Sequence, residues 1–394
     1  MDGIHTPDLG RISPVLRMRS SEVALFYAIL TDMSSLSIGI VGLPNVGKST
    51  LFNALTNNDI LAANYPFATI EPNTGIVPVP DERLNILQKM YASEKILPAT
   101  VTFVDIAGLV AGASKGEGLG NKFLANIRQC DAIVHVVRAF ENSDILRHDE
   151  APVNPKDDID IINTELILAD IQTIENRLPK LQKEAKAKPE VREQAGYLES
   201  LLRHLQNGTS LSALPDINSE LIKDLHLLTA KPVIYAFNVD ENSLSDQQVT
   251  SELVKLVAPA QSLFVCAKLE EELKGLNESE AKELLESYGV TETGLMQLIH
   301  AAYDTLGLQS YLTAGPKEVR AWTIHQGDTA PQAAGVIHTD FEKGFIAAQV
   351  ITFDDLVAAG SEQSAKAAGK VRTEGKTYVM QPGDVVEFRF NVSK

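Results

Sequence analysis

Residues 37–50 read Ser-Ile-Gly-Ile-Val-Gly-Leu-Pro-Asn-Val-Gly-Lys-Ser-Thr, and this stretch predicts how the first half of the chain folds. A short apolar run, Ile38 to Val41, leads into the pattern Gly-x4-Gly-Lys-Ser at residues 42–49. Helix formers with a helical apolar periodicity follow at residues 51–55. Strand, glycine-rich loop and helix in this order predict a phosphate-binding loop.

The residue types in this loop suit phosphate chemistry. Gly42 and Gly47 let the backbone come close enough for its N–H groups to surround phosphate oxygens. Lys48 can place a positive charge near the β- and γ-phosphates, and the Ser49 hydroxyl can ligate Mg²⁺. The positive end of the following helix adds to the attraction.

Composition sets outer limits on what the protein does. With 394 residues the chain is long enough for two or three domains, and its 44% apolar and 22% charged residues are ordinary for a globular protein. A formal charge of −17 argues against broad attraction to nucleic acid or anionic membrane, although local patches can still bind RNA. Cys130 and Cys266 have no metal-ligand spacing, so we expect buried thiols in a reduced, cytoplasmic protein.

The first 32 residues fit poorly with the rest of the chain. Three arginines precede a short apolar run at residues 23–30, as in a signal peptide, but no small-residue cleavage site follows. The run is also far shorter than the roughly 20 residues of a membrane span. We expect residues 1–32 to be a disordered extension and the compact domain to begin near Met33, with no membrane partner.

Two further stretches predict the rest of a magnesium and γ-phosphate site. Thr69 lies in an extended, proline-flanked loop, where a switch segment supplies a second hydroxyl to Mg²⁺. The strand-like run 101–104 ends in Asp105-x-x-Gly108. There the Asp105 carboxylate can hold Mg²⁺ through water, and the Gly108 N–H can reach the γ-phosphate. The glycine-rich residues 110–120 suit a segment that orders and disorders with nucleotide state.

A water-positioning group is missing from its usual place. Ras-like enzymes carry a glutamine directly after this motif, whereas this chain has Leu109. Either another group positions the attacking water or intrinsic hydrolysis is slow. His135 and Asn45 are candidates, although the position of His135 inside the apolar run 132–137 favours a core histidine.

A helical insertion interrupts the alternating pattern. Apolar residues spaced three and four apart run through two segments of residues 157–228, separated at Lys188-Pro189. This periodicity predicts an antiparallel hairpin close to a coiled coil. Pro179 should kink or interrupt its first helix. We expect the insertion to contact protein partners.

The strands near residues 231–240 and 262–266 should end at the base of the nucleotide. Guanine-specific enzymes place Asn-Lys-x-Asp after the first strand, but here the quartet is Asn238-Val239-Asp240-Glu241. The lysine is absent and a carboxylate is shifted by one position, which compromises guanine recognition. Asn238 and backbone groups near Val239 could instead satisfy adenine. Backbone groups of Cys266 and Ala267 should line the second base loop.

After Gly307 the sequence becomes rich in β-formers, with strands and turns expected at residues 317–324, 335–346 and 378–392. From Tyr311 onward the chain has nine basic and ten acidic residues, so this part is nearly neutral. It is therefore the best location for an RNA surface, although Trp322 and Phe345 are expected to be core residues. The candidate RNA-binding side chains are Arg320, Trp322, His338, Lys343, Lys370 and Arg372.

Five motifs together carry a family resemblance that extends from about Ser37 to Val392. They are residues 42–50, 67–75, 105–120, 238–241 and 337–345. With these motifs in this order, the chain closely resembles the YchF/Obg-like ATPase family. The resemblance implies an α/β P-loop NTPase domain, with a mostly parallel sheet, at residues 33–145 and 229–306. It also implies a helical hairpin at 146–228 and a β-grasp TGS domain at 307–392.

The same resemblance implies ATP hydrolysis in preference to GTP, dependence on Mg²⁺, and association with the ribosome or its large subunit, including rRNA, in translation or stress regulation. Ser49 and Thr69 would serve Mg²⁺, Val239 would contact adenine, and Asn45 suggests activation by K⁺. The two alternatives are a GTPase of the same fold and a nucleotide-stabilised regulator with negligible hydrolysis. The residues implied to bind the phosphates are Asn45, Val46, Gly47, Lys48, Ser49 and Thr50.

Overall fold

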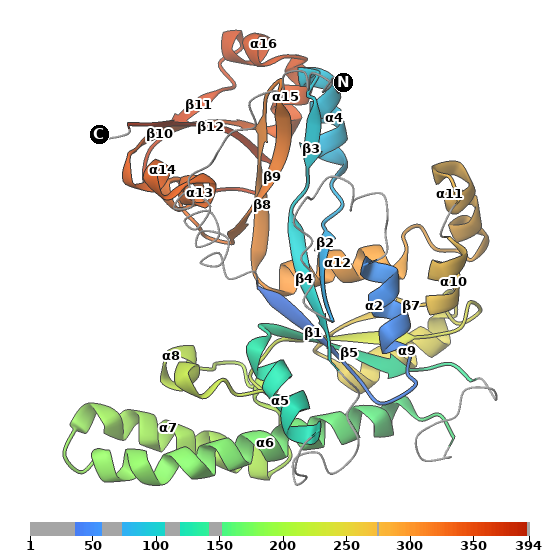
Figure 1. The fold of residues 1–394 in the computed structure, drawn as a ribbon, viewed down its shortest axis with the longest axis vertical. Helices are drawn as coiled ribbons and strands as arrows, with labels where there is room; N and C mark the ends of the chain where they lie inside the picture. Colours follow the sequence, from blue (N-terminus) through green and yellow to red (C-terminus); the bar gives the residue numbers. More distant parts are fainter. Residues whose placement is uncertain (1–35, 57–72, 107–118, 142–151, 274–275, 392–394) are drawn as a thin grey trace, which may run out of the picture. The chain divides into compact units, whose positions relative to one another are not determined.

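The computed structural model describes residues 36–56, 73–106, 119–141, 152–273 and 276–391. The expected extension at residues 1–32 lies outside these ranges. Within them, two six-stranded sheets form the framework, each with helices packed against it (Figure 1). No helix in these ranges is both long enough and apolar enough to cross a membrane.

The first sheet has the strand order β2-β4-β1-β5-β6-β7. The last five of these strands run parallel, and β2 pairs antiparallel with β4 at the edge. Unbroken apolar runs explain the arrangement, because a parallel sheet covered on both faces buries nearly every side chain. The bounds are β1 Ser37–Val41, β2 Thr74–Pro78, β4 Thr100–Asp105, β5 Ala132–Arg138, β6 Val233–Asn238 and β7 Gln261–Val265.

Strand β6 shows how the two faces are covered. Ile234 and Ala236 belong to the core that includes α2 and α12, whereas Tyr235 and Phe237 pack with residues of α6 and α9. This alternation follows from the two-residue period of a strand. The helices of this part are α2 Lys48–Thr56, α5 Leu119–Gln129, α9 Gln247–Val257, α10 Ala267–Glu272, α11 Glu278–Ser287 and α12 Gly294–Thr305.

The predicted helical hairpin is present. Helices α6 (Pro155–Glu184) and α7 (Pro189–Gln206) pack on each other around their own apolar cluster, and the break at Lys188-Pro189 is confirmed. The expected interruption at Pro179 is wrong, since α6 continues through it. Proline removes one backbone donor, and buried Ile174 and Leu181 hold the helix on either side. Short turns follow as η1 Leu211–Ala213, α8 Ser219–Ile222 and η2 Lys223–Leu225.

A buried carboxylate fixes the return from the hairpin to the sheet. Asp170 of α6 is fully buried and accepts hydrogen bonds from the backbone N–H of Leu228 (2.9 Å) and Thr229 (2.7 Å). It also accepts one from the Thr229 hydroxyl at 2.7 Å. Burial raises the pKa of Asp170, and these three bonds oppose that rise. The carboxylate therefore connects α6 to the segment that enters β6.

The second sheet has the order β11-β10-β12-β8-β9-β3, and its helices are consistent with the predicted β-grasp domain. The expected strands and turns at residues 335–343 are wrong, because this segment is helical. Gln332 accepts from the Thr329 N–H at 2.8 Å and so caps the first helix. The elements are β8 Leu308–Ala314, β9 Glu318–His325, α13 Ala330–Ile337, α14 Thr339–Lys343, β10 Phe345–Thr352, α15 Phe353–Ala359, α16 Glu362–Ala367, β11 Arg372–Glu374 and β12 Asp384–Phe390.

One strand of this second sheet comes from the middle of the first domain. Strand β3 (Lys95–Leu97) pairs parallel with β9, and α4 (Glu82–Tyr91) packs against β8 and β9. The Ser93 hydroxyl donates to the Gly315 carbonyl at 2.6 Å. Buried residues of both sheets belong to one apolar cluster. Residues 82–97 therefore join the nucleotide part to the carboxyl-terminal part.

Replacing Asp170 with Ala should lower the free energy of unfolding by about 3 kcal/mol, because three donors lose a buried charged acceptor. Urea denaturation measures the change. Asp224→Ala is the matched control, since Asp224 makes only a partly exposed ion pair with Arg177 and should cost less than about 1 kcal/mol. Equal losses in the two variants would contradict this account of the hairpin junction.

Candidate functional site

Two glycines of the phosphate-loop pattern stand where a side chain does not fit. A Cβ at Gly42 would lie 2.5 Å from the Val136 carbonyl oxygen. Gly47 has φ +99°, and a Cβ there would lie 2.4 Å from the Asn238 side-chain nitrogen. The loop is thus packed directly against the ends of β5 and β6. Asn45 also adopts a left-handed conformation, with φ +62°.

Lys48 points back into this loop. Its side chain is buried, and Nζ donates to the Leu43 carbonyl at 2.8 Å. Burial lowers the pKa of Lys48, while the nearby Asp105 carboxylate raises it. The Lys48 amino group therefore lies inside the loop, and the Asp105 carboxylate is its nearby electrostatic partner.

Ser49 and Asp105 come together although 56 positions separate them in sequence. The Ser49 hydroxyl lies 3.4 Å from Asp105 Oδ2, because β4 lies beside β1 in the sheet. Asp105 Oδ1 is buried and has no hydrogen-bond partner among the residues that the structure describes. A hydroxyl beside a carboxylate with a spare oxygen fits a hard cation such as Mg²⁺. Thr69, Gly108 and Leu109 lie outside the described residues.

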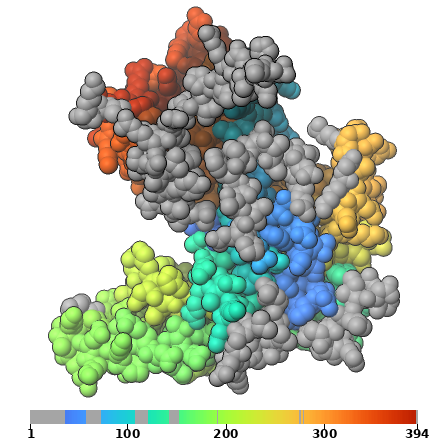
Figure 2. All heavy atoms as spheres, viewed as in Figure 1, coloured from blue at the N-terminus to red at the C-terminus, as the bar shows by residue number. Residues whose placement is uncertain are grey.

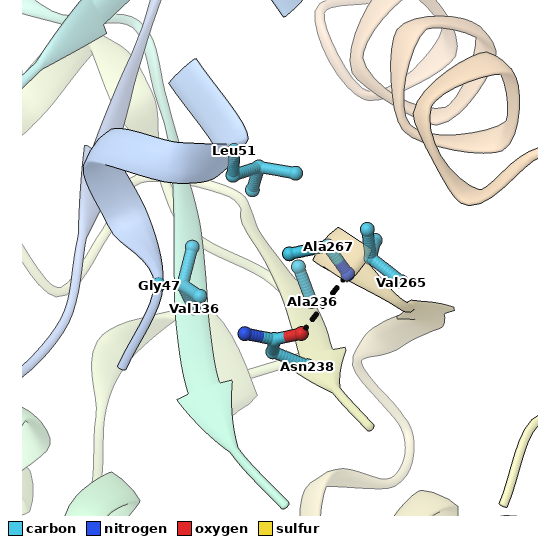
Figure 3. A pocket seen from close by; sticks show the side chains of 7 residues that line it. All are labelled: Gly47, Leu51, Val136, Ala236, Asn238, Val265 and Ala267. Carbon is cyan, nitrogen blue, oxygen red and sulfur yellow. Dashed lines mark hydrogen bonds between the residues drawn. The ribbon is translucent and has the colours of Figure 1, made fainter. Parts of the chain in front are cut away.

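The Asn238 side chain joins three segments of the site (Figure 3). Its nitrogen donates to the Val46 carbonyl at 3.0 Å, and its oxygen accepts from the Ala267 N–H at 3.4 Å. These bonds link the phosphate loop, the end of β6 and the start of α10. The side chains that surround this junction are Leu51, Val136, Ala236 and Val265.

The remaining residues of the predicted base-reading quartet are already engaged. Val239 is buried, and its N–H donates to the Val265 carbonyl at 2.9 Å. Asp240 accepts from the Ser243 N–H at 2.9 Å, which turns its carboxylate into the following turn. Glu241 forms an ion pair with Lys268 that lowers the Glu241 pKa. Both carboxylates of the quartet therefore have partners within the chain.

The two cysteines and His135 lie in the core, as predicted. Cys130 and Cys266 are free buried thiols, and burial raises the pKa of each. His135 is 1% exposed, and burial, with a smaller effect of Lys48, lowers its pKa to about 3. Its Nε2 has no partner among the described residues. A neutral ring inside the sheet is consistent with the core interpretation of His135.

Glu270, which the sequence did not single out, lies directly behind the second base loop. Its buried side chain accepts from the Leu295 N–H at 3.1 Å, at the start of α12. Burial raises the pKa of Glu270 to about 7 despite that bond. Glu270 is one of several glutamates in residues 270–278, and nothing in the sequence distinguishes it from the others. Only the tertiary packing buries it.

Several side chains of the candidate RNA surface have partners within the domain. Arg320 lies over the Trp322 ring at 3.8 Å, and Lys370 pairs with Asp355 at 3.0 Å. Arg372 lies 3.7 Å from Glu374. Trp322 is half-buried against the core cluster. The buried Phe345 belongs to the same cluster, as expected.

Comparisons with known proteins identify relatives over most of the chain. Residues 37–169 match the family model MMR_HSR1, described as a 50S ribosome-binding GTPase, and residues 308–391 match YchF-GTPase_C, described as a protein of unknown function. Ribosome-binding ATPase YchF of Haemophilus influenzae is 53% identical and aligns over 90% of this chain and 99% of its own. The Bacillus subtilis protein of that name is 50% identical, over 91% and 100%.

A solved structure also matches over nearly the whole chain. The Schizosaccharomyces pombe YchF GTPase shares 40% sequence identity, with a TM-score of 0.80. The match covers 90% of this chain and 98% of that one. The P-loop fold with its helical insertion and carboxyl-terminal β-domain is thus common to both.

Replacing Asn238 with Ala should weaken nucleotide binding roughly tenfold or more, because the phosphate loop loses its bond to β6 and α10. Titration with a fluorescent ATP analogue measures the affinity. Asn242→Ala, an exposed asparagine nearby, is the control and should bind normally. Wild-type affinity in Asn238→Ala would show that the junction does not shape the site.

Glu270 should make stability depend on pH. Its native pKa of about 7 exceeds the ordinary 4.5, so the folded protein keeps a proton that the unfolded chain releases between these values. Stability therefore falls as pH rises through this window. Relative to Glu270→Gln, the wild type should lose up to about 3 kcal/mol between about pH 5 and pH 8 in urea titrations. Glu271→Gln, at an exposed neighbour, should follow the wild type.

Proposed function

Because the chain belongs to the YchF family of P-loop nucleotidases, we propose that it is a cytoplasmic, Mg²⁺-dependent ATPase that acts as a nucleotide-controlled switch on the ribosome. The observation that carries the proposal is the convergence of Lys48, Ser49 and the spare Asp105 oxygen at the phosphate loop. Such a cluster binds and orients a nucleotide triphosphate chain.

The residues of the loop have separate tasks in this proposal. The ammonium group of Lys48 leaves the Leu43 carbonyl for the β- and γ-phosphates and stabilises negative charge on the transferred phosphoryl group. Backbone N–H groups of residues 45–50 and of Gly108 hold the phosphate oxygens. Ser49 and Thr69 would ligate Mg²⁺, and Asp105 would hold it through water. When bound, Mg²⁺ neutralises charge that develops between the β- and γ-phosphates.

A preference for adenine follows from the base-reading quartet. Guanine recognition needs a free carboxylate opposite two N–H donors of the base, but Asp240 and Glu241 already have partners. The groups proposed to contact the base are Asn238, the backbone around Val239 and the Cys266-Ala267 segment. The Asn238 amide and the N–H groups of Val239 and Ala267 also form hydrogen bonds within the chain. The names of the relatives differ on this point, since the bacterial proteins are called ATPases and the yeast protein a GTPase. A GTPase of the same fold is the first alternative.

The ribosome is proposed as the partner because the bacterial relatives carry the name ribosome-binding ATPase. The large subunit with its rRNA is the expected contact, and the helical hairpin offers a surface for it or for proteins. Leu109 in place of glutamine implies slow intrinsic hydrolysis that the partner or K⁺, bound near Asn45, accelerates. The second alternative is a regulator whose nucleotide only stabilises one conformation.

Replacing Lys48 with Ala should abolish multiple-turnover phosphate release from ATP, because the loop loses the ammonium group proposed to stabilise charge on the transferred phosphoryl group. A coupled phosphate assay measures the rate, and circular dichroism checks the fold. Lys255→Ala, at an exposed position of α9, should keep wild-type turnover. Unchanged turnover in Lys48→Ala would defeat the proposed role of Lys48.

Competition between ATP and GTP, with and without ribosomes and in Na⁺ or K⁺ buffers, tests the remaining parts. We expect ATP to displace bound nucleotide at lower concentration than GTP, and ribosomes to raise turnover. A preference for GTP would establish the first alternative. Nucleotide binding without phosphate release in the presence of ribosomes would establish the regulator.

A further inference from the structure

The end of the helical hairpin carries a concentration of positive charge. We call residues 180–192, which join α6 to α7, the arm tip. Its five basic and two acidic residues give a formal charge of +3 in a chain whose formal charge is −17. The basic residues of the arm tip are Lys180, Lys183, Lys186, Lys188 and Arg192.

Charge is segregated along the arm. Residues 155–175, which form the first part of α6, contain one basic and six acidic residues. Three of the acidic residues are buried, so the exposed side chains of this part carry one positive and three negative charges. Near the start of α6 the exposed charges are mixed, since Lys156 and Asp160 form an i,i+4 ion pair. Toward the far end of α6 the exposed charge becomes positive. This gradient separates the arm tip from the acidic remainder of the molecule.

The basic groups of the arm tip are free to bind an anion. All five side chains are exposed, and none forms an ion pair with a described residue. Arg177, just below the tip, differs because it pairs with Asp224. Figure 2 shows the hairpin surface, in green, open to solvent on the viewed face. An incoming polyanion therefore has no ion pair with a described carboxylate to displace at these five side chains.

The arm is built to hold its tip in a fixed direction. Asp170 anchors α6 at the sheet, and at 1.5 Å per residue Glu184 lies roughly 20 Å farther along the helix axis. Between these points Ile174 and Leu181 pack with Leu198 of α7 in a core separate from the sheet. A packed two-helix arm loses little conformational freedom on docking.

We propose that the arm tip docks on the phosphate backbone of RNA. Lys180 and Lys183 lie three residues apart and share one side of α6, so both can reach neighbouring phosphates. These lysines supply positive charge for phosphate groups and are not arranged to bind base edges. The contact therefore positions the protein on the RNA and does not recognise the RNA sequence. The negative remainder of the chain repels RNA, which confines the contact to the tip. This inference rests on the proposed ribosome association, and it identifies the RNA phosphate backbone as the group that the arm tip contacts.

The test compares a fourfold Lys→Gln variant at positions 180, 183, 186 and 188 with a fourfold Lys→Arg variant at the same positions. Full-length proteins are titrated with purified ribosomes and with protein-free ribosomal RNA over a range of salt concentrations. The Gln variant should bind both at least tenfold more weakly near 0.15 M salt, where the Debye length is about 8 Å. Its binding should also depend less steeply on salt concentration. The Arg variant should bind like the wild type, and ATP turnover without ribosomes should not change.

The control removes exposed lysines elsewhere, as Lys255→Gln, Lys317→Gln and Lys376→Gln together, and should leave RNA binding unchanged. Wild-type RNA affinity in the fourfold Gln variant would overturn the inference. So would weaker ribosome binding with unchanged affinity for bare RNA, since the tip would then contact ribosomal protein. Tip-dependent RNA binding in a protein that does not hydrolyse ATP would overturn the proposed function and leave the inference intact.

Discussion

The amide group of Asn238 occupies the space that a side chain at residue 47 would need, and the candidate site depends on this close approach. Its donor and acceptor hold the Val46 carbonyl and the Ala267 N–H at the same time. Three segments far apart in sequence therefore meet at the carboxyl edge of one parallel sheet, which is where ligands bind in such sheets. Lys48 and Ser49 follow directly from the loop that this contact fixes.

The same sheet edge is connected to the second sheet through the chain between β2 and β4. Strand β4 ends at Asp105, beside Ser49, and begins three residues after β3, which pairs with β9. Helix α4 adds apolar contacts through Leu84 and Leu87. The sheet edge that holds Ser49 and Asp105 and the carboxyl-terminal domain thus share one continuous segment and one core.

Charge placement distinguishes the surfaces of the molecule. Asp240 and Glu241, the acidic residues of the quartet, both have partners within the chain. Arg320, Lys370 and Arg372 in the carboxyl-terminal domain also have internal partners. The lysines of the arm tip make no ion pair with any described residue. The basic side chains of the arm tip and those of the carboxyl-terminal domain therefore differ in how readily they can bind an anion.

The sequence by itself determined the parallel sheet, the phosphate loop and the hairpin, because apolar periodicity and glycine placement are local properties. It did not predict the helices at residues 335–343, since their caps involve side-chain bonds that periodicity does not reveal. The continuity of α6 through Pro179 also depends on packing with α7. The bond from the Ser243 N–H to Asp240 is a local turn contact. Only the tertiary structure placed β3 in the second sheet, buried Glu270 and paired Glu241 with Lys268. Each of these results from contacts between distant segments, which no local pattern encodes.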